Sequence, residues 1–387
     1  MTSPCSIAEL AERAGLRRLH VITWRDLDHP EAGGSELHIN HLAREWSDAG
    51  LDVILRTSEV KGLAATIERD GYRVVRRGNP LSVLLRNPFA ERSSGTEPGT
   101  GLVEVWHGIN FLAPLWTSIP RIAIAHHVHG EQFRQVLPGP AGVVAEQMER
   151  LLYPRLYRNT PLVTLSASSR VELLELGYRP ERVHIASPGI DPGFRPDPST
   201  PISSTPTIVA VARLMPQKHV DVVIRMVARL RRSFPDLKAV IVGDGPELGA
   251  LEALARDLDV LDHVEIRGRV DHADLVALYR RSWLLVSAST AEGWGMTITE
   301  AAACGTPAVA TRIAGHRDAV ADRVSGLLAD DVDEIERHIA LVLHDRGLRA
   351  RLASGAIEHA APFTWQRCAF DTLSPLAAQM QPDNGKR

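Results

Sequence analysis

Short apolar runs alternate with helical patterns along most of this chain, and the alternation occurs in two separate series. In the first series, the run at 19–23 (LHVIT) leads into a polar, glycine-rich turn, after which Leu37, Leu42 and Trp46 recur at helical spacing. Further apolar runs follow at 52–55, 72–75, 102–106, 121–125 and 162–165. Strands that alternate with helices form mostly parallel sheets covered on both faces. The sequence therefore predicts an α/β fold.

A proline-rich segment separates the two series. Residues 191–206 (DPGFRPDPSTPISSTP) contain five prolines and much serine and threonine, which is typical of a linker. Apolar runs then resume at 207–212, 237–242, 264–267, 283–287 and 308–311. At 387 residues the chain is long enough for two domains of ordinary size. We predict doubly wound, Rossmann-like domains at 1–195 and 207–363, a linker at 196–206, and ligand binding in a cleft beyond the carboxyl ends of the strands.

Three further segments complete this organisation. Residues 87–101 (NPFAERSSGTEPGTG) are rich in glycine, serine, proline and charge, which predicts a mobile surface loop. The pattern at 335–359 predicts two short helices, and the pattern at 363–380 predicts a last helix.

Charge and cysteine content exclude several classes of protein. The chain has 44 basic and 47 acidic side chains, so no global positive field attracts nucleic acid. No apolar run approaches the roughly 18 residues of a membrane-spanning helix, and the first residues lack the pattern of a secretory signal. Cys5, Cys304 and Cys368 lie far apart, without the spacing of a disulfide framework or a zinc site. We expect a cytoplasmic protein, with peripheral contact at the inner face of the membrane left open.

Two cations follow the first strand of the second series. Arg213 and Lys218 come directly after the run at 207–212, where the chain turns into a helix. Such a pair can stabilise a departing diphosphate by charge-assisted contacts, without a metal ion. Ordinary surface charges on a solvated loop are an equally compatible interpretation.

Two carboxylates flank a glycine-rich turn further along the chain. Glu292 and Glu300 are separated by seven residues, and a helix is expected to begin near Gly295. Gly293 and Gly295 permit close approach of the backbone, and the free amides at a helix start favour an anion. Glu300 would then hold the diol of a ribose from within the helix, while Glu292 stays in the loop.

In the first series, polar residues again follow the strands. Residues 33–36 (GGSE) occupy the loop after the run at 19–23, where glycines admit a phosphate or a sugar ring, although a turn with Ser35 as an N-cap is also compatible. His126, His127 and His129 follow the run at 121–125. We do not favour a metal site there, because Glu131 is the only nearby carboxylate and alternate residues point to opposite faces. We expect one of these histidines to hydrogen-bond a sugar hydroxyl.

Three further patterns have competing interpretations. Residues 243–249 (GDGPELG) faintly resemble a dinucleotide-binding loop, but their spacing and acidic side chains argue against a nicotinamide cofactor. Asp26 and Asp28 could be taken for a metal-binding aspartate pair, but the same short pattern recurs at Asp257/Asp259 and Asp331/Asp333, so we attribute it to chance. The stretch at 141–158 (AGVVAEQMERLLYPRLYR) is compatible with an anionic lipid surface, but we favour a helix packed in the core of the first domain.

Taken together, these residues resemble the retaining family 4 glycosyltransferases of the GT-B fold. The most specific part is 292–309, which is similar to the E-x7-E signature and its following Gly-x-Pro, and the likeness extends over nearly the whole chain. It implies that Arg213 and Lys218 bind the diphosphate, that Glu300 binds the ribose and that Glu292 binds the transferred sugar. It also implies that a C-terminal helix at 364–387 packs back on the first domain.

The resemblance implies two groups of site residues. The catalytic group comprises His126, His127, Glu292, Arg213 and Lys218. The donor-binding group comprises Gly33, Gly34, Arg213, Lys218, Gly293, Gly295, Met296, Thr297 and Glu300. The family usually has an acidic residue where this chain has His127, and often a glycine where it has His219.

The expected reaction transfers a hexosyl unit from a UDP- or GDP-sugar to a hydroxyl acceptor, which would be a lipid, a glycan or a small molecule. The resemblance implies retention of anomeric configuration, and we favour a front-face mechanism in which the leaving phosphate helps to deprotonate the acceptor. No cofactor and no metal ion are expected. The alternatives are a sugar phosphorylase or a nucleotide-sugar epimerase on the same fold, and a non-catalytic subunit that binds sugar nucleotides.

Overall fold

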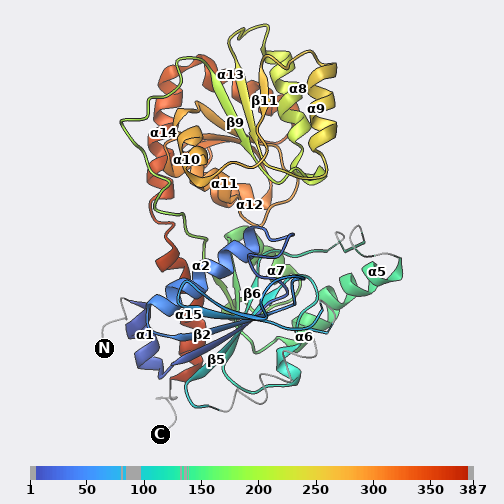
Figure 1. The fold of residues 1–387 in the computed structure, drawn as a ribbon, viewed down its shortest axis with the longest axis vertical. Coiled ribbons are helices and arrows are strands. Elements are labelled where there is room, and N and C mark those ends of the chain that lie inside the picture. Colours follow the sequence, from blue (N-terminus) through green and yellow to red (C-terminus); the bar gives the residue numbers. More distant parts are fainter. Residues whose placement is uncertain are drawn as a thin grey trace. The chain divides into compact units, whose positions relative to one another are not determined.

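The computed structural model describes residues 6–79, 82–83, 97–130, 133–134, 137 and 139–381 (Figure 1). The chain divides into two compact units: unit 1 comprises 1–189 and 365–387, and unit 2 comprises 190–364. The first boundary between the units lies at 189, whereas the sequence predicts 195, and the proline-rich segment belongs to unit 2. Main-chain hydrogen bonds hold it there, because Ile190 N donates to Phe363 O (2.9 Å) and Ser203 N donates to Arg281 O (3.0 Å).

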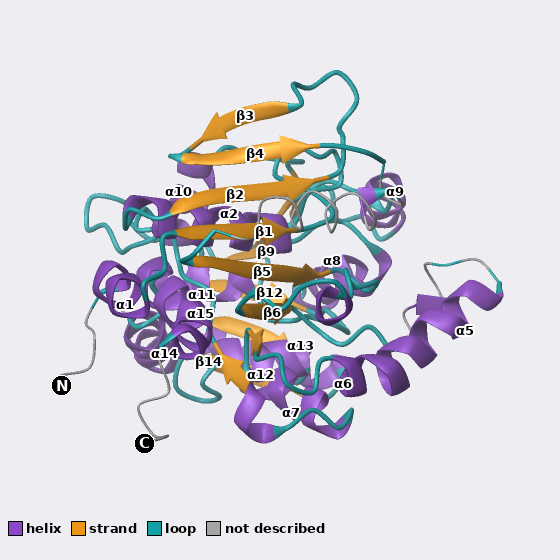
Figure 2. Cartoon of the chain, turned by 90° about the horizontal axis from the view of Figure 1, so that it is seen from below, coloured by secondary structure: helices purple, strands orange, loops and turns teal. Residues whose placement is uncertain are grey.

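Unit 1 contains an eight-stranded sheet with the order β3-β4-β2-β1-β5-β6-β7-β8, and Figure 2 shows its first five strands in this order. The strands are β1 (Arg18–Ile22), β2 (Asp52–Thr57), β3 (Thr66–Arg69), β4 (Tyr72–Arg76), β5 (Thr100–Trp106), β6 (Arg121–Ala125), β7 (Leu162–Thr164) and β8 (Val183–Ile185). All neighbours pair in parallel except β3, which is antiparallel to β4. The sequence did not predict β3 and β8, because both are short edge strands without a continuous apolar run.

The helices of unit 1 include two that are far apart in the sequence and pack together. They are α1 (Ile7–Ala14), α2 (Gly34–Asp48), α5 (Pro140–Gln147), α6 (Tyr153–Leu156), α7 (Ala167–Glu175) and α15 (Trp365–Met380), with a π-helical stretch at Met148–Leu152 and 3-10 turns at Ala113–Leu115 and Pro180–Arg182. Helix α15 packs on α1 and α2, and Trp46 Nε1 donates to Ala369 O (3.1 Å). Most of the expected surface loop, at 84–96, lies outside the described residues, as do Cys5, Glu131 and 382–387, whereas residues 100 and 101 belong to β5.

Unit 2 contains a six-stranded parallel sheet with the order β11-β10-β9-β12-β13-β14. Its strands are β9 (Thr207–Val211), β10 (Lys238–Val242), β11 (Val264–Ile266), β12 (Leu284–Ser287), β13 (Ala308–Thr311) and β14 (Gly326–Ala329). Its helices are α8 (Val220–Leu230), α9 (Leu248–Asp257), α10 (His272–Arg281), α11 (Met296–Ala303), α12 (Ala314–Ala319), α13 (Val332–His344) and α14 (Arg346–Ala360), with a 3-10 turn at Pro216–Lys218.

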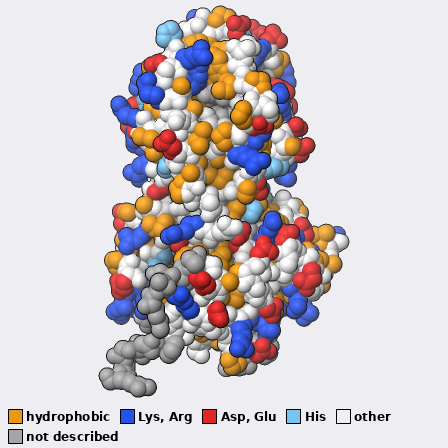
Figure 3. Space-filling view, turned by 90° about the vertical axis from the view of Figure 1, so that its left-hand side faces the viewer, with side chains coloured by type: hydrophobic (Ala, Val, Ile, Leu, Met, Phe, Trp, Pro, Cys, Tyr) orange, Lys and Arg blue, Asp and Glu red, His pale blue; other side chains and the backbone are white. Residues whose placement is uncertain are grey.

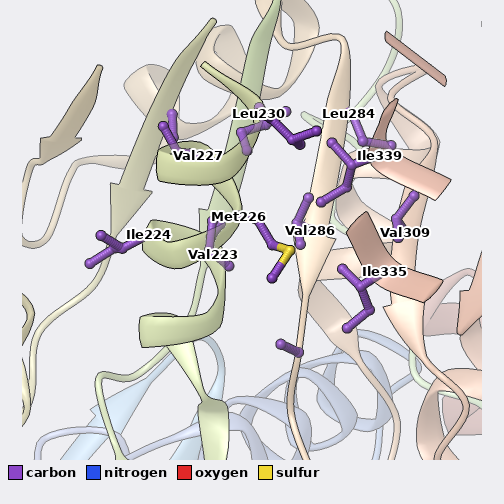
Figure 4. Packing of buried hydrophobic residues seen from close by; sticks show 14 of the residues in the cluster. Val223, Ile224, Met226, Val227, Leu230, Leu284, Val286, Val309, Ile335 and Ile339 are labelled. Atoms are coloured by element: carbon purple, nitrogen blue, oxygen red, sulfur yellow. The ribbon is translucent and has the colours of Figure 1, made fainter. Parts of the chain in front are cut away.

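The core of unit 2 follows from the spacing of apolar residues on α8. Val223, Ile224, Val227 and Leu230 recur at helical intervals, and all are buried. They belong to one buried cluster with residues of β12 and β13, and Figure 4 shows part of this cluster together with Ile335 and Ile339 of α13. A helix with such an apolar face gains most of its stability by burying that face against a sheet.

Two surface properties follow from the described residues. Acidic and basic side chains are interspersed on the face shown in Figure 3, without a large area of one sign. No helix in the described part of the chain combines the length and the apolar character that crossing a membrane requires.

Candidate functional site

The strand order of unit 2 reverses between β9 and β12. From β9 the chain adds β10 and β11 on one side, and from β12 it adds β13 and β14 on the other. In open α/β sheets, ligands bind beyond the carboxyl ends of the strands at such a switch point. Arg213 and Lys218 follow β9, and Glu292 follows β12. The two strands that flank the reversal therefore carry three of the predicted site residues.

Lys218 and Glu292 form a direct ion pair. Lys218 Nζ donates to Glu292 Oε1, which also accepts a hydrogen bond from Ser289 Oγ (3.1 Å). The two loops are joined by their backbones as well, because Thr290 N donates to Gln217 O (2.9 Å). The side chains of Lys218 and Glu292 are only 19% and 22% exposed. Each side chain is therefore held in position by the other and has little contact with solvent.

Arg213 lies beside this pair in sequence but is exposed. Within the described residues its guanidinium has no hydrogen bond or ion pair, so its five donors are available to an anion. The turn that follows brings Lys218 back, because Met215 N donates to Arg213 O (2.8 Å) and Lys218 N donates to Met215 O (2.9 Å). His219 then adopts φ 45°, in the left-handed region, which explains why glycine suits this position.

Glu300 lies in α11 and is held from α10. Tyr279 Oη donates to Glu300 Oε2 (3.2 Å). Burial raises the pKa of Glu300 to about 8, and the nearby charge of Asp191 adds to this shift. The carboxyl is therefore largely protonated at neutral pH, and it can both donate and accept a hydrogen bond.

The start of α11 presents backbone amides without a side-chain cap. Gly295 is the N-cap residue and has φ 118°, a conformation that side chains rarely adopt. Gly293, Met296 and Thr297 adjoin it and are all partly exposed. A helix start with this geometry is suited to an anion, as the glycines in the sequence predicted.

The glycines at 243–245 have a structural reason. A Cβ on Gly243 would lie 1.8 Å from Ala212 O, and one on Gly245 would lie 2.3 Å from Leu214 O. Ala212 and Leu214 flank Arg213 in the sequence. The two glycines therefore allow the chain that follows β10 to pack against the segment that carries Arg213. Gly315 has the same role beside Glu292, because a Cβ at position 315 would lie 2.4 Å from the main-chain oxygen of Glu292.

His316 was not predicted from the sequence, and it lies beside the loop of Glu292. His316 is fully buried in α12, where Nδ1 donates to Thr311 O (2.9 Å) and Nε2 lies 3.2 Å from Ser287 Oγ. It ties the ends of β12 and β13 together. Its only signal in the sequence is a histidine shortly after a strand, and that signal is weak.

In unit 1 the strand order reverses between β1 and β5, and the glycine loop follows β1. Helix α2 begins at Gly34, and Gly33, not Ser35, is its N-cap residue. Glu36 Oε2 accepts hydrogen bonds from Gly33 N (2.8 Å) and Ser35 Oγ (3.0 Å). The glycine loop is therefore shaped by the buried carboxylate of the first helical turn.

His126 and His127 point in different directions at the end of β6. His126 is 7% exposed and lies between His38 of α2 (Nδ1 to His126 Nε2, 3.3 Å) and His107 (ring centroids 5.9 Å). His127 is exposed and lies against His129, with ring centroids 4.3 Å apart. The alternation along an extended chain thus separates the two neighbours.

His107 connects His126 to the glycine loop. It follows β5 directly, and its Nε2 lies 3.9 Å from Glu36 Oε1 and 3.3 Å from Thr23 Oγ1. The ends of β1, β5 and β6 therefore meet at one edge of the sheet. His107 was not predicted as a site residue, although its place directly after a strand was a signal in the sequence.

Burial keeps the inner histidines neutral. It lowers the pKa of His38 to about 3 and that of His107 to about 4, and it lowers the pKa of His126 well below its ordinary value. Nearby imidazoles add to the shift of His126. At neutral pH each ring therefore carries one proton and acts as one donor and one acceptor.

The possible metal-binding patterns have other partners. Among the described residues, no group of three or more His, Cys, Asp or Glu side chains has the arrangement of a metal site. Asp26 is buried, and its Oδ2 accepts a hydrogen bond from Arg76 Nε (3.0 Å), while Asp28 pairs with Arg69 and Arg76. The carboxylate near His129 is Glu149, which accepts from His129 N (3.0 Å).

From the sequence we favoured a helix at 141–158 that packs in the core of the first domain. In the structure, the helical stretch at 140–156 instead has much of its apolar surface exposed. Val144 and Leu151 are 57% and 50% exposed, and Arg150 and Arg155 are exposed beside them. Its buried residues are Gly142 and Ala145 on α5, and Tyr153 and Pro154 at its far end. The apolar residues of this stretch therefore form a surface feature of unit 1.

The predicted residues thus divide between the two units. Arg213, Lys218, Glu292 and Glu300 lie around the switch point of unit 2, with Lys218 and Glu292 in contact. Gly33, Gly34 and His126 lie at the corresponding edge of unit 1, and His127 points away from the inner histidines.

Known proteins match both halves of the chain. The model of glycosyl transferases group 1 matches residues 196–359, and that of glycosyltransferase family 4 matches residues 32–194. A D-inositol 3-phosphate glycosyltransferase of Frankia alni is 33% identical over 91% of this chain and 96% of the relative. One from Stackebrandtia nassauensis is 29% identical over 95% of this chain and 93% of the relative.

Solved structures match the whole fold. Sucrose-phosphate synthase from Thermosynechococcus elongatus superposes with a TM-score of 0.75 and 18% identity, over 94% of this chain and 97% of that chain. Anabaena HepE in complex with UDP and glucose superposes with a TM-score of 0.69 and 19% identity, over 90% of this chain and 95% of that chain.

Proposed function

The chain belongs to the family 4 glycosyltransferases of the GT-B fold, and from this premise we propose that it transfers a hexosyl unit from a UDP- or GDP-sugar to a hydroxyl acceptor. We propose further that transfer retains the anomeric configuration and requires no metal ion. One observation carries the proposal: two cations, the carboxyl groups of Glu292 and Glu300, and an uncapped helix start surround the switch point of unit 2.

The cations would neutralise the diphosphate of the donor. Arg213 offers unengaged donors, and Lys218 is held in place by Glu292. The negative charge that develops on a leaving diphosphate must be neutralised, and in other enzymes metal ions fill this role. The amides at the start of α11 add a third source of positive potential. These groups support a mechanism without a metal.

The carboxyl groups of Glu300 and Glu292 would hold the two sugars of the donor. Tyr279 engages Oε2 of Glu300, which leaves Oε1 for a ribose hydroxyl. Ser289 and Lys218 both engage Oε1 of Glu292, which leaves Oε2 for a hydroxyl of the transferred sugar. In each case one oxygen is used for positioning and the other remains for the ligand.

We place the acceptor side in unit 1, at the ends of β1, β5 and β6. His126 would bind a substrate hydroxyl, and the loop of Gly33 and Gly34 would admit the substrate. The relatives named above act on an inositol phosphate, which makes a small phosphorylated polyol the first acceptor to test. In the front-face mechanism, the leaving phosphate oxygen takes the proton of the acceptor hydroxyl.

The first experiment measures release of nucleoside diphosphate from UDP- and GDP-sugars, with and without acceptor and with EDTA. We expect release that depends on the acceptor, persists in EDTA, and yields a product with the donor's anomeric configuration by NMR. Conversion of the donor sugar to an epimer without acceptor would indicate an epimerase, and turnover driven by inorganic phosphate would indicate a phosphorylase. Inhibition by EDTA or an inverted product would refute the corresponding part of the proposal.

The second experiment measures binding of UDP and GDP by calorimetry. Arg213→Ala removes charged hydrogen bonds, each worth about 1.5–3 kcal/mol, so we expect the Kd to rise about 10- to 100-fold. Arg256→Ala is the matched control, because Arg256 is exposed on α9 and has no partner within the described residues. Equal affinities for the two variants would remove Arg213 from the site.

The exposed stretch at 140–156 supports a second, independent proposal. Valine and leucine side chains beside arginines favour peripheral binding to an anionic lipid surface. Co-sedimentation with vesicles that contain anionic lipid tests this. We expect binding that Val144→Glu with Leu151→Glu abolishes, and no binding by the unaltered protein would exclude the membrane.

A further inference from the structure

A buried chain of side chains links the last helix of unit 1 to His126. Cys368 lies in α15, His38 in α2 and His126 at the end of β6, and all three are more than nine-tenths buried. His38 lies between the other two, 3.4 Å from Cys368 Sγ through Nε2 and 3.3 Å from His126 Nε2 through Nδ1. The mechanism above uses neither Cys368 nor His38.

The direction of these hydrogen bonds follows from the outer end of the chain. Cys368 Sγ donates to Ala186 O (3.8 Å), and a carbonyl oxygen can only accept. Since the thiol has a single proton, Sγ must accept from His38 Nε2–H. His38 is neutral, because burial lowers its pKa to about 3, so its Nδ1 carries no proton and must accept. The proton between the two rings therefore resides on His126 Nε2.

His126 is consequently left with an unprotonated Nδ1. This atom is buried and has no hydrogen-bond partner among the described residues. A buried polar atom without a partner costs free energy, which the fold tolerates where a ligand will satisfy it. The unprotonated nitrogen is an acceptor, so its partner must be a donor, such as a hydroxyl group.

The rings in this chain are also held in place from the side. Trp365, in the first turn of α15, lies 5.9 Å from the His38 ring, and the His38 and His126 rings meet edge to face at 5.1 Å. Helix α15 thus contributes both the thiol and an aromatic wall. A rotation of either imidazole would break the sequence of hydrogen bonds.

We propose that Cys368 and His38 are positioning residues that fix His126 in the tautomer with the proton on Nε2, so that Nδ1 accepts a hydrogen bond from a substrate hydroxyl. The role of the hydroxyl rests on the proposed function, whereas the tautomer is a property of the free protein.

The tautomer is measured directly by long-range proton–nitrogen NMR of the histidine rings in the full chain labelled with ¹⁵N. We expect the His126 and His38 signals to show Nε2 protonated and Nδ1 unprotonated at pH 7.5. A wild-type His126 with the proton on Nδ1 would overturn the proposal without any variant. This arm is independent of transferase activity, so its failure is distinct from failure of the proposed function.

Variants of Cys368 test whether its thiol fixes the tautomers of His38 and His126. Cys368→Ala removes the acceptor of His38 Nε2–H, so we expect His38 and His126 to become tautomer mixtures and kcat to fall about 10-fold, since misorientation of a contacting group costs this much or more. Cys368→Ser keeps a group that accepts and donates, and should largely restore one tautomer and kcat. Cys304→Ala removes a matched buried thiol from unit 2 and should leave the His126 signals unchanged. Unchanged His126 signals in Cys368→Ala would refute the role of the thiol.

Discussion

Replacing Glu300 by glutamine should stabilise unit 2, increasingly so as the pH rises. Burial raises the pKa of this carboxyl to about 8, whereas the ordinary value is 4.5. The folded state therefore holds a proton that the unfolded state releases above about pH 4.5. Stability falls as the pH rises from about 4.5 to about 8, and the penalty is constant above that range. Glutamine has the same shape and does not titrate, so it removes this penalty.

The size of the effect follows from the difference in pKa. At pH 7.5 the shift corresponds to about 4 kcal/mol, and solvent that reaches this partly exposed carboxyl reduces the expected gain to about 2–4 kcal/mol. Tyr279 can still donate to the glutamine oxygen, so the substitution keeps that contact. The variant and the wild type should have similar stabilities near pH 4.5.

Urea unfolding at a series of pH values from 5 to 9 measures this difference. Glu358→Gln is the matched control, because Glu358 is exposed on α14. We expect the stability difference between Glu300→Gln and wild type to grow with pH up to about 8, and that of the control to stay near zero. A difference for Glu300→Gln that is independent of pH, or that grows toward acid, would refute the reasoning.

Three further predictions concern stability. Burial lowers the pKa of His38 to about 3, so this residue is protonated in the unfolded chain but not in the folded protein as the pH falls below about 6.5, and the free energy of unfolding decreases. His38→Gln should reduce this decrease at acid pH, as measured by urea unfolding. An unchanged decrease would contradict the assignment. Gly243→Ala should cost about 3 kcal/mol or more, because its φ is 145° and its Cβ would lie 1.8 Å from a backbone oxygen; Gly249→Ala, with open space around it, is the control in thermal unfolding, and equal midpoints would exclude the clash. Asp26→Asn should cost about 1–3 kcal/mol, because Arg76 loses the charge of its buried partner and keeps only Asp28, whose side chain is 44% exposed; an unchanged midpoint would argue against a structural role for this pair.

Residue patterns predicted much of the fold because its signals are local. Apolar runs marked β1, β2, β4, β5, β6 and β7 in unit 1 and five of the six strands of unit 2 to within about two residues. The strands β3, β8 and β14 were missed, since they are short and all three lie at the edges of their sheets. The predicted boundary at 195 differs from the unit boundary at 189, because proline content indicates a break in regular structure but does not show which unit holds the segment by hydrogen bonds.

The candidate site was predicted in part, for a similar reason. Polar residues at strand ends indicated Arg213, Lys218 and Glu292 correctly as neighbours of one sheet edge. His38 lies inside a helix and His316 is buried below a loop, so neither stands out among 16 histidines in the sequence. Their roles come from burial and from the partners that face them.

Local sequence by itself determined where strands, helices and tight glycine turns form, because each depends on residues a few positions apart. Only the tertiary structure decided which of these segments become neighbours. The pairing of β9 with β12 brings Lys218 to Glu292, 74 residues away, and the packing of α15 on α2 brings Cys368 to His38, 330 residues away. Strand order and helix docking minimise exposed apolar surface over a whole unit, and no short stretch of sequence contains that information.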